Sequence, residues 1–237
     1  MPSIAQIKHI ASLRMPKFRQ KYGQFVVEGR KAVEEVFHSG WLLEGIWATE
    51  SFLERFAPPY PCDLMTEEEN KKCTSFDTPP GVMALVNMPK SMGLNLDVPF
   101  VLALDGISDP GNMGTIIRLA DWFGLKQIVA SEDCVDAFNP KCLAATMGSF
   151  LRVEVVYTKL ALAAEGRVVY GAFLEGESVH GIALEGKNML LIGSESHGIR
   201  PEAAALVTKP VTIPGKGGAE SLNAGIATAI LLDNMLR

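Results

Sequence analysis

Three glycine-containing segments in the second half of the chain carry the side chains best suited to chemistry. The first spans residues 105–114 and holds Asp105, Asp109 and Asn112 among three glycines and one proline, with Arg118 about one helical turn beyond it. Glycine lets a backbone bend sharply and approach a ligand closely. A guanidinium beside such a loop is suited to binding phosphate or a developing negative charge.

The second segment is Gly-Ser-Glu-Ser-His-Gly at residues 193–198, directly after an apolar run. Its serines and histidine suggest a serine hydrolase. However, Glu195 occupies the position at which the nucleophile-elbow pattern Gly-x-Ser-x-Gly requires serine. Adjacent serine and histidine on one loop also do not form a triad by themselves. The segment is better suited to holding a small ligand against backbone amides.

The third segment spans residues 213–223 and contains four glycine or lysine positions that resemble a phosphate loop only superficially. Lys216 precedes the paired glycines and has no serine or threonine after it, so the P-loop pattern is not satisfied. Ser221 and Asn223 stand where the N-cap of a terminal helix over residues 224–236 is expected. Free backbone N–H groups at such a helix start favour an anionic or polar ligand.

A metal site is not expected. The four cysteines form no C-x-x-C pair, and the four histidines lie nowhere near them at metal-ligand spacing. Reduced, partly buried thiols are the better interpretation.

The elements that must position these segments follow an α/β pattern. A break over residues 87–99 separates two parts, which predicts a small α/β domain at residues 1–90 and a larger domain at residues 98–237. In the second part, apolar runs alternate with helical stretches, which indicates a parallel sheet covered on both sides. Ligands of such sheets bind at the carboxyl ends of the strands. The strands are expected at 25–27, 45–48, 62–65 and 81–86 in the first part, and at 100–104, 128–130, 151–156, 168–173, 189–192 and 211–213 in the second. The helices are expected at 29–38, 51–56, 115–123, 139–147 and 224–236.

Charge is distributed unevenly along the chain. The net charge is −5, which argues against a protein that coats nucleic acid nonspecifically. Residues 1–31 nevertheless carry seven basic side chains against Glu28 alone, whereas residues 91–237 carry 11 basic and 16 acidic side chains. The basic end suits a local phosphate contact, and the alternative is a solvated surface.

Taken together and in this order, the three segments resemble the motifs of the SpoU/TrmH family of RNA ribose 2′-O-methyltransferases. The first motif is matched by residues 105–118, the second by residues 193–198, and the third by Ile213-Pro214 with Ser221-Leu222-Asn223. The amino-terminal part also resembles the small RNA-binding domain often fused ahead of this enzyme, through residues 17–19, 25–29 and 80–82.

The resemblance implies an α/β, Rossmann-like methyltransferase domain whose carboxy-terminal segment threads a loop to form a deep trefoil knot. Generic folding rules would not predict such a knot. It also implies S-adenosylmethionine as methyl donor, held by backbone groups around Gly193, Ile213 and Leu222, without a metal. A homodimer is implied as well, with each active site near the subunit interface. The apolar residues of the terminal helix fit this, although they can instead pack within the same chain: Ile226, Ile230, Leu231, Leu232 and Met235.

By resemblance Arg118 is the central catalytic residue. A guanidinium is a poor proton acceptor, so we expect Arg118 to bind the adjacent phosphate or the developing alkoxide. Removal of the hydroxyl proton is then left to Glu195, water or the phosphate. Asn112, Ser221 and Asn223 are expected to orient groups by hydrogen bonding.

The expected partner is RNA, either ribosomal or transfer RNA, contacted by Lys17, Arg19 and Lys21 in the basic segment. The rival hypothesis is a catalytically silent RNA-binding protein on the same fold, which the intact Arg118 disfavours. The basic segment likewise disfavours a small-molecule methyltransferase. Departures from the family pattern at Ser194, Ser196 and Gly215 bear on substrate choice.

A cytoplasmic location is expected. No apolar run reaches the ~18 residues that span a bilayer. The first residues also lack the uninterrupted apolar stretch of a secretory signal.

Overall fold

Ten strands of the computed structural model, which describes residues 1–237, form two separate sheets. The sheets belong to two units. Unit 1 comprises residues 1–90 and 138–151, and unit 2 comprises residues 91–137 and 152–237.

The sheet of unit 1 is mixed and has the strand order β1-β4-β2-β3. β4 pairs antiparallel with both β1 and β2, and β3 is added parallel to β2. The four strands match the ranges predicted from their apolar runs to within two residues at each end. Their bounds are β1 Gln24–Glu28, β2 Leu43–Ala48, β3 Asp63–Leu64 and β4 Val82–Asn87.

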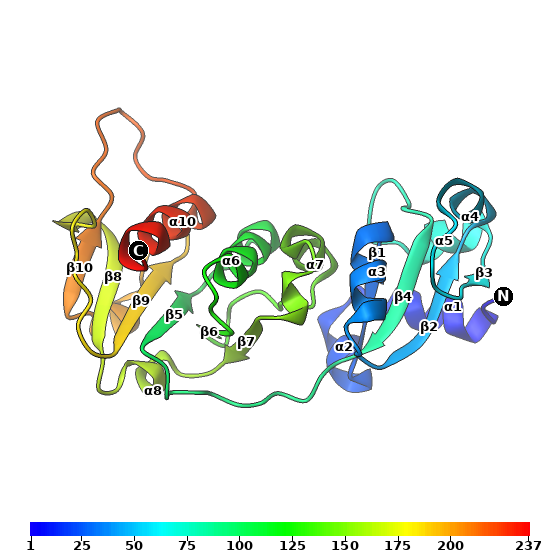
Figure 1. Ribbon diagram of the computed structural model, residues 1–237, viewed down its shortest axis with the longest axis horizontal. Coiled ribbons are helices and arrows are strands. Elements are labelled where there is room, and N and C mark those ends of the chain that lie inside the picture. The colour runs from blue at the N-terminus through cyan, green and yellow to red at the C-terminus, as the bar shows by residue number, and fades with distance from the viewer. The chain divides into compact units, whose positions relative to one another are not determined.

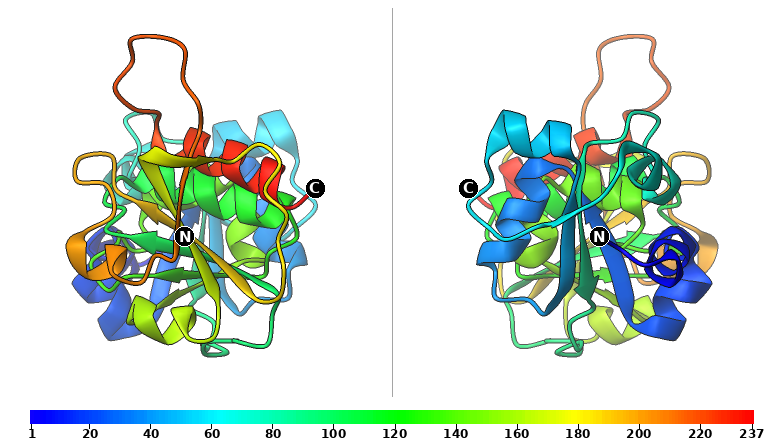
Figure 2. Two further views of the ribbon diagram at one scale, coloured as in Figure 1. Left: turned by 90° about the vertical axis from the view of Figure 1, so that its left-hand side faces the viewer. Right: turned by 90° about the vertical axis from the view of Figure 1, so that its right-hand side faces the viewer.

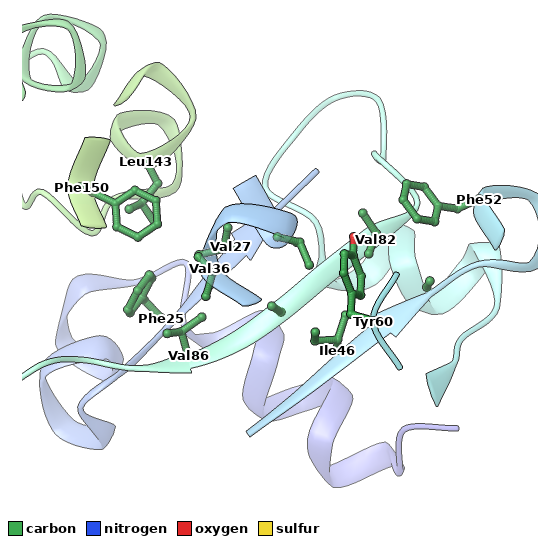
Figure 3. Packing of buried hydrophobic residues seen from close by; sticks show 13 residues of the cluster. Phe25, Val27, Val36, Ile46, Phe52, Tyr60, Val82, Val86, Leu143 and Phe150 are labelled. Atoms are coloured by element: carbon green, nitrogen blue, oxygen red, sulfur yellow. The ribbon is translucent and has the colours of Figure 1, made fainter. Parts of the chain in front are cut away.

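Helices cover both faces of this sheet. Successive side chains of a strand point to opposite faces, so neighbouring residues of β1 belong to different clusters. Phe25 and Val27 belong to a cluster with α3 and α4, which Figure 3 shows in close-up. Val26, between them, belongs to a second cluster with α1, α2 and α5. The helix bounds are α1 Ile4–Ser12, α2 Pro16–Tyr22, α3 Arg30–His38, α4 Glu50–Phe56 and α5 Glu67–Cys73.

No helix was expected before residue 29, yet α1 and α2 are both present. The signal for α1 is a capping box, in which the Ser3 hydroxyl accepts from the Gln6 amide and the Gln6 side chain accepts from the Ser3 amide. Pro16 at the first position of α2 and Gly23 in the left-handed region after it mark the ends of that helix.

Residues 138–151 join unit 1, although the sequence-based division grouped them with the second domain. They form α7 (Pro140–Thr146) and a short 3-10 helix, η1 (Ser149–Leu151). Leu143 and Phe150 complete the cluster that contains Phe25 (Figure 3). Hydrophobic burial rather than chain order therefore decides which unit this segment belongs to.

The sheet of unit 2 has six strands in the order β10-β8-β9-β5-β6-β7, and every pairing is parallel. This confirms the parallel sheet predicted from alternating strands and helices. The strand predicted at 151–156 starts later than expected, at residue 154, because residues 149–151 are helical. The bounds are β5 Phe100–Asp105, β6 Gln127–Ala130, β7 Glu154–Tyr157, β8 Val168–Ser178, β9 Asn188–Gly193 and β10 Lys209–Thr212.

Two pairs of helices cover this sheet. α8 (Leu160–Ala164) and α9 (Pro201–Ala204) share one hydrophobic cluster with β5 and β9. α6 (Pro110–Trp122) and α10 (Ala224–Met235) lie together on the other side, as Figure 1 shows. Their contact is close, because a β-carbon on Gly225 would lie 2.9 Å from Thr115 Cγ2.

Residues 213–223, between β10 and α10, form neither helix nor strand. In both views of Figure 2 this segment projects as a long loop beyond the elements it joins. No helix of the structure combines the length and the apolar character that crossing a bilayer requires.

Candidate active site

The carboxyl ends of β5 and β9 lie side by side, because these two central strands pair in parallel. Asp105, the last residue of β5, is directly opposite Gly193, the last residue of β9. The first two chemistry-bearing loops therefore leave the sheet from neighbouring positions, as expected for the binding edge of a parallel sheet.

The loop after β5 ends in the start of α6. The Asp109 carboxylate accepts a hydrogen bond of 2.8 Å from the Asn112 amide and so caps the helix, and Pro110 occupies its first turn. The helix consequently begins five residues earlier than the predicted range 115–123. Asn112 thus lies within the first turn of α6 rather than in the loop.

The loop after β9 is closed on itself. The Ser194 amide donates to the Gly198 carbonyl over 3.1 Å, and the Gly198 amide donates to the Ser194 carbonyl over 2.8 Å. A β-carbon on Gly193 would lie 2.1 Å from the Gly198 carbonyl carbon, so no larger residue fits this turn. His197 and Ser196 hydrogen-bond each other in the exposed part of the loop.

Side chains from all three loops converge at the start of α10. Asn223 is the N-cap of this helix, as predicted, and its Oδ1 accepts from the Gly225 and Ile226 amides. Its Nδ2 donates to Asn112 Oδ1 over 2.8 Å and also to Glu195 Oε1. Glu195 Oε1 further accepts from the amide of residue 224, so its carboxylate lies at the positive end of the helix dipole.

Three predicted site residues remain outside this network. Arg118 is exposed on α6 and forms no hydrogen bond or ion pair within the chain. Ser221 and Leu222 are exposed in the loop before α10, and the Ser221 hydroxyl likewise has no partner there. Arg118 is therefore a cation whose donors are all available to a ligand.

Sequence reasoning missed an ionic network that holds the first two loops together. The backbone amide of Arg200 donates to Asp105 Oδ2 over 2.8 Å, and its guanidinium binds Asp105 Oδ1 and both carboxylate oxygens of Asp133. The Ser131 hydroxyl donates to Asp133 and accepts from the Gly106 amide. The only available signal was the charge of Arg200 two residues beyond the second motif.

The network has a clear electrostatic effect. The Arg200 guanidinium lowers the pKa of the Asp133 carboxyl below its ordinary value, with a further contribution from the Ser131 hydroxyl. Hydrogen bonds to Asp105 and Asp133 raise the pKa of Arg200 in turn. Both shifts favour the charged forms of Asp133 and Arg200.

Two of the residues predicted to hold a cofactor, Ile213 and Leu222, frame an open stretch of backbone. A β-carbon added to Gly215, Gly217 or Gly218 would meet no atom within 4 Å. Ile213 is half-buried and Leu222 exposed at the two ends of this stretch. Apolar side chains beside accessible backbone amides and carbonyls fit a nucleoside, which has apolar ring faces and polar edges.

The predicted RNA contacts divide into two kinds. Lys17 and Lys21 are exposed on α2 and lie over the rings of Phe18 and Tyr22, at 4.9 and 5.2 Å from the ring centroids. Arg19, in contrast, is only 1% exposed, and its Nη1 donates to the carbonyls of residues 13 and 14. The prediction that Arg19 contacts RNA is therefore wrong, because its guanidinium is used inside unit 1.

The terminal helix also differs from expectation. Leu231, Leu232 and Met235 are buried within the chain, so they cannot supply a surface for a second subunit. Ile226 remains exposed, and Trp122 at the end of α6 is 83% exposed. No group of three or more His, Cys, Asp or Glu side chains is arranged as a metal site.

Comparison with known proteins identifies the family of the chain. The sequence model of the SpoU rRNA methylase family matches residues 99–233. The chain belongs to the SpoU rRNA methylase family. The model of the MRM3-like substrate binding domain matches residues 5–84, which correspond to most of unit 1.

Individual relatives are similar to this chain over nearly its whole length. The 23S rRNA (guanosine(2553)-2′-O)-methyltransferase RlmP of Bacillus subtilis is 32% identical over 96% of the chain and 94% of its own length. A solved structure from Porphyromonas gingivalis, assigned to the TrmH family of RNA methyltransferases, is 36% identical. It has a TM-score of 0.83 and covers 99% of this chain and 98% of its own. The AdoMet-bound rRNA methyltransferase of Sinorhizobium meliloti is 29% identical, with a TM-score of 0.81 and coverage of 99% and 95%.

Proposed function

We propose that the protein transfers the methyl group of S-adenosylmethionine to the 2′-hydroxyl of a ribose in ribosomal RNA. The observation that carries the proposal is the meeting of Asn112, Glu195 and Asn223 at one point in a member of the SpoU family. These three side chains come from three separate segments: the first turn of α6, the loop after β9 and the N-cap of α10. The relative from Bacillus subtilis is named for the same reaction on 23S rRNA.

The protein's task in such a reaction is to position the ribose hydroxyl and stabilise the charge that develops on its oxygen. S-adenosylmethionine supplies an electrophilic methyl group on a sulfonium. Arg118 is the free cation on α6, and its planar fork binds the ribose-phosphate and the developing alkoxide. The hydroxyl would lose its proton as its oxygen bonds to the methyl carbon, while the bond from that carbon to the donor sulfur breaks and leaves S-adenosylhomocysteine.

Asn112, Glu195 and Asn223 act mainly by holding the site in shape. Glu195 Oε1 is already engaged by Asn223 Nδ2 and by the first amide of α10. Its second oxygen, Oε2, carries no such bond. This oxygen, water and the RNA phosphate are the groups available to accept the hydroxyl proton. The hydroxyl of Ser221 is free to orient the ribose.

The donor is held by the backbone around Gly193, Ile213 and Leu222. This rests on the open glycine stretch 215–218 and on the apolar side chains beside it. The carboxy-terminal segment forms the family's trefoil knot in this proposal. What supports it is that the chain runs to β10 at the edge of the sheet and then returns, so that α10 packs on α6 and β9.

Unit 1 docks the RNA through its exposed cations. Six of the seven basic residues in the segment 1–31 are exposed, and Lys17 and Lys21 each flank an aromatic ring on α2. Basic side chains beside aromatic rings suit phosphates with neighbouring unpaired bases. Tyr22, which is exposed, is the ring best placed to stack on a base.

The protein acts as a homodimer in this proposal, and in the cytoplasm. Exposed Trp122 and Ile226, on two helices that pack together, supply apolar surface for a second copy. Sedimentation of the purified protein tests this, since a monomer at micromolar concentration would contradict it.

The decisive experiment for the activity is methyl transfer from labelled S-adenosylmethionine to ribosomal RNA from cells lacking the gene, followed by mapping of 2′-O-methylated positions. One ribose methylated in a donor-dependent manner is expected. Transfer to tRNA alone would show that the substrate is transfer RNA rather than ribosomal RNA. RNA binding without donor binding would show a catalytically silent protein and contradict the proposal.

A further inference from the structure

Two arginines bind opposite ends of the same central strands of unit 2, in different ways. At the carboxyl ends, Arg200 binds the side chains of Asp105 and Asp133. At the amino ends, Arg167 donates only to backbone carbonyls, those of Leu96, Val98 and residue 188. The two residues therefore form an internal comparison between one arginine beside the candidate active site and one far along the strands from it.

The Arg200 network joins three loops. Asp105 is only 2% exposed and ends β5, while Arg200 is 43% exposed and lies just beyond the loop 193–198. Asp133 belongs to the loop after β6 and is 54% exposed. The backbone amide and the guanidinium of Arg200 bind different oxygens of Asp105, so Arg200 is fixed at two points.

The loop 193–198 depends on this arrangement at its far end. Its near end is held by the pairing of Gly193 with Asp105, and its middle is closed by the two hydrogen bonds between Ser194 and Gly198. Without the Arg200 guanidinium, the buried Asp105 carboxylate would lose its charge partner next to Gly193. An unpaired buried charge draws in water or moves its surroundings, since burying it uncompensated is costly.

We propose that Arg200 is a positioning residue for methyl-donor binding, acting through Asp105 and Asp133 to hold the loop 193–198 in its binding conformation. The inference rests on the proposed function, because it assumes that this loop receives the donor. Arg200 itself is assigned no contact with donor or RNA.

The test measures affinity for S-adenosylhomocysteine by calorimetry in full-length protein, for Arg200→Gln, Arg200→Lys and Asp133→Asn. Arg200→Gln is expected to weaken binding about tenfold, as is common when the support of a binding group is removed. Arg200→Lys is expected to recover part of the affinity, because one ammonium cannot serve both carboxylates as a planar fork does. Asp133→Asn is expected to have the smallest effect, since Asp105 remains paired.

Arg167→Gln is the matched control. It removes a guanidinium that donates three hydrogen bonds to backbone carbonyls at the amino ends of the strands, away from the loop 193–198, so a lower melting temperature with unchanged affinity for S-adenosylhomocysteine is expected. In steady-state methylation, Arg200→Gln is expected to raise KM for S-adenosylmethionine by a similar factor while kcat at saturating donor changes much less.

Three outcomes are informative. If Arg200→Gln lowers the melting temperature but leaves the affinity for S-adenosylhomocysteine unchanged, the positioning role is wrong. It is also wrong if Arg167→Gln weakens the binding of S-adenosylhomocysteine as much as Arg200→Gln does. If Arg200→Gln fails to fold, the graded effects of Arg200→Lys and Asp133→Asn decide the question. The same affinity for S-adenosylhomocysteine in these two variants would overturn the proposal. If the unmutated protein does not bind S-adenosylhomocysteine, the proposed function fails, and this inference fails with it.

Discussion

The two units have similar layers but distribute their loops differently. Each sheet has helices on both faces and buries its central strands, β4 in unit 1 and β5 and β9 in unit 2. In unit 1, β4 runs antiparallel to both of its neighbours, so the carboxyl ends of its strands are divided between two edges. In unit 2 all six strands are parallel, so every carboxyl end meets the same edge. Polar loops can therefore converge into a catalytic site in unit 2, whereas unit 1 presents exposed side chains on its helices.

Two arginines illustrate the difference. Arg19 in unit 1 is buried against backbone carbonyls, and Arg118 in unit 2 is exposed without a partner. The first serves the fold and the second is available for chemistry. The following predictions test this division, beginning with the largest expected effect.

Arg118→Ala is expected to reduce methylation by about 10²–10³-fold while leaving the melting temperature and the affinity for S-adenosylhomocysteine unchanged. The exposed guanidinium is expected to contribute to turnover rather than to folding. Arg118→Lys is expected to recover little, because a point charge does not reproduce the fork. Single-turnover methylation with parallel calorimetry checks this, and a fully active lysine variant would show that positive charge alone suffices.

Arg19→Ala is expected to show the reverse pattern. It leaves the carbonyls of Leu13 and Arg14 without their buried donor, which costs about 2–4 kcal/mol of unfolding free energy. The affinity for S-adenosylmethionine should not change. Urea unfolding measures the loss, with Lys17→Ala as the matched surface control. A variant as stable as the parent would mean that Arg19 is not held as the structure shows.

Lys17→Ala combined with Lys21→Ala is expected to weaken RNA binding about tenfold and to lower the salt slope by about one to two units. Both side chains are exposed, so stability should stay within ~0.5 kcal/mol. Filter binding across a salt series checks this. Lys126 and Lys159, exposed in unit 2 and outside the three loops, provide a matched pair for the same substitutions. Equal effects of the two pairs would refute a docking role specific to α2.

Asp133→Asn tests the electrostatics at the edge of unit 2 and has the smallest expected effect. Because Arg200 lowers the pKa of Asp133 in the folded state, the stabilisation is present above the ordinary value of 3.8 and is lost as pH falls through the lower folded value. The parent should thus lose slightly more stability than the variant between pH 4 and more acidic conditions, where Asp133 becomes protonated. Thermal unfolding over this range measures the difference, and parallel curves would contradict it.

The sequence by itself determined the elements whose burial is complete and the order of the polar loops. Continuous apolar runs such as 100–104 and 189–192 predict strands covered on both faces, because only such strands can be apolar at every position. The N-cap role of Asn223 also follows from local chemistry, since an asparagine side chain satisfies the free amides at a helix start.

Only the tertiary structure decided which cations are free and which segments share a core. Arg19 and Lys17 look alike in a basic segment, but helix rotation turns one inward and the other outward. The segment 138–151 joins unit 1 because its apolar side chains are buried there, which no local pattern encodes. The partnership of Arg200 with Asp105, 95 positions earlier in the chain, arises from parallel pairing of β5 with β9. Long-range pairing of this kind depends on the register of the whole sheet, and a local reading of the sequence does not contain that register.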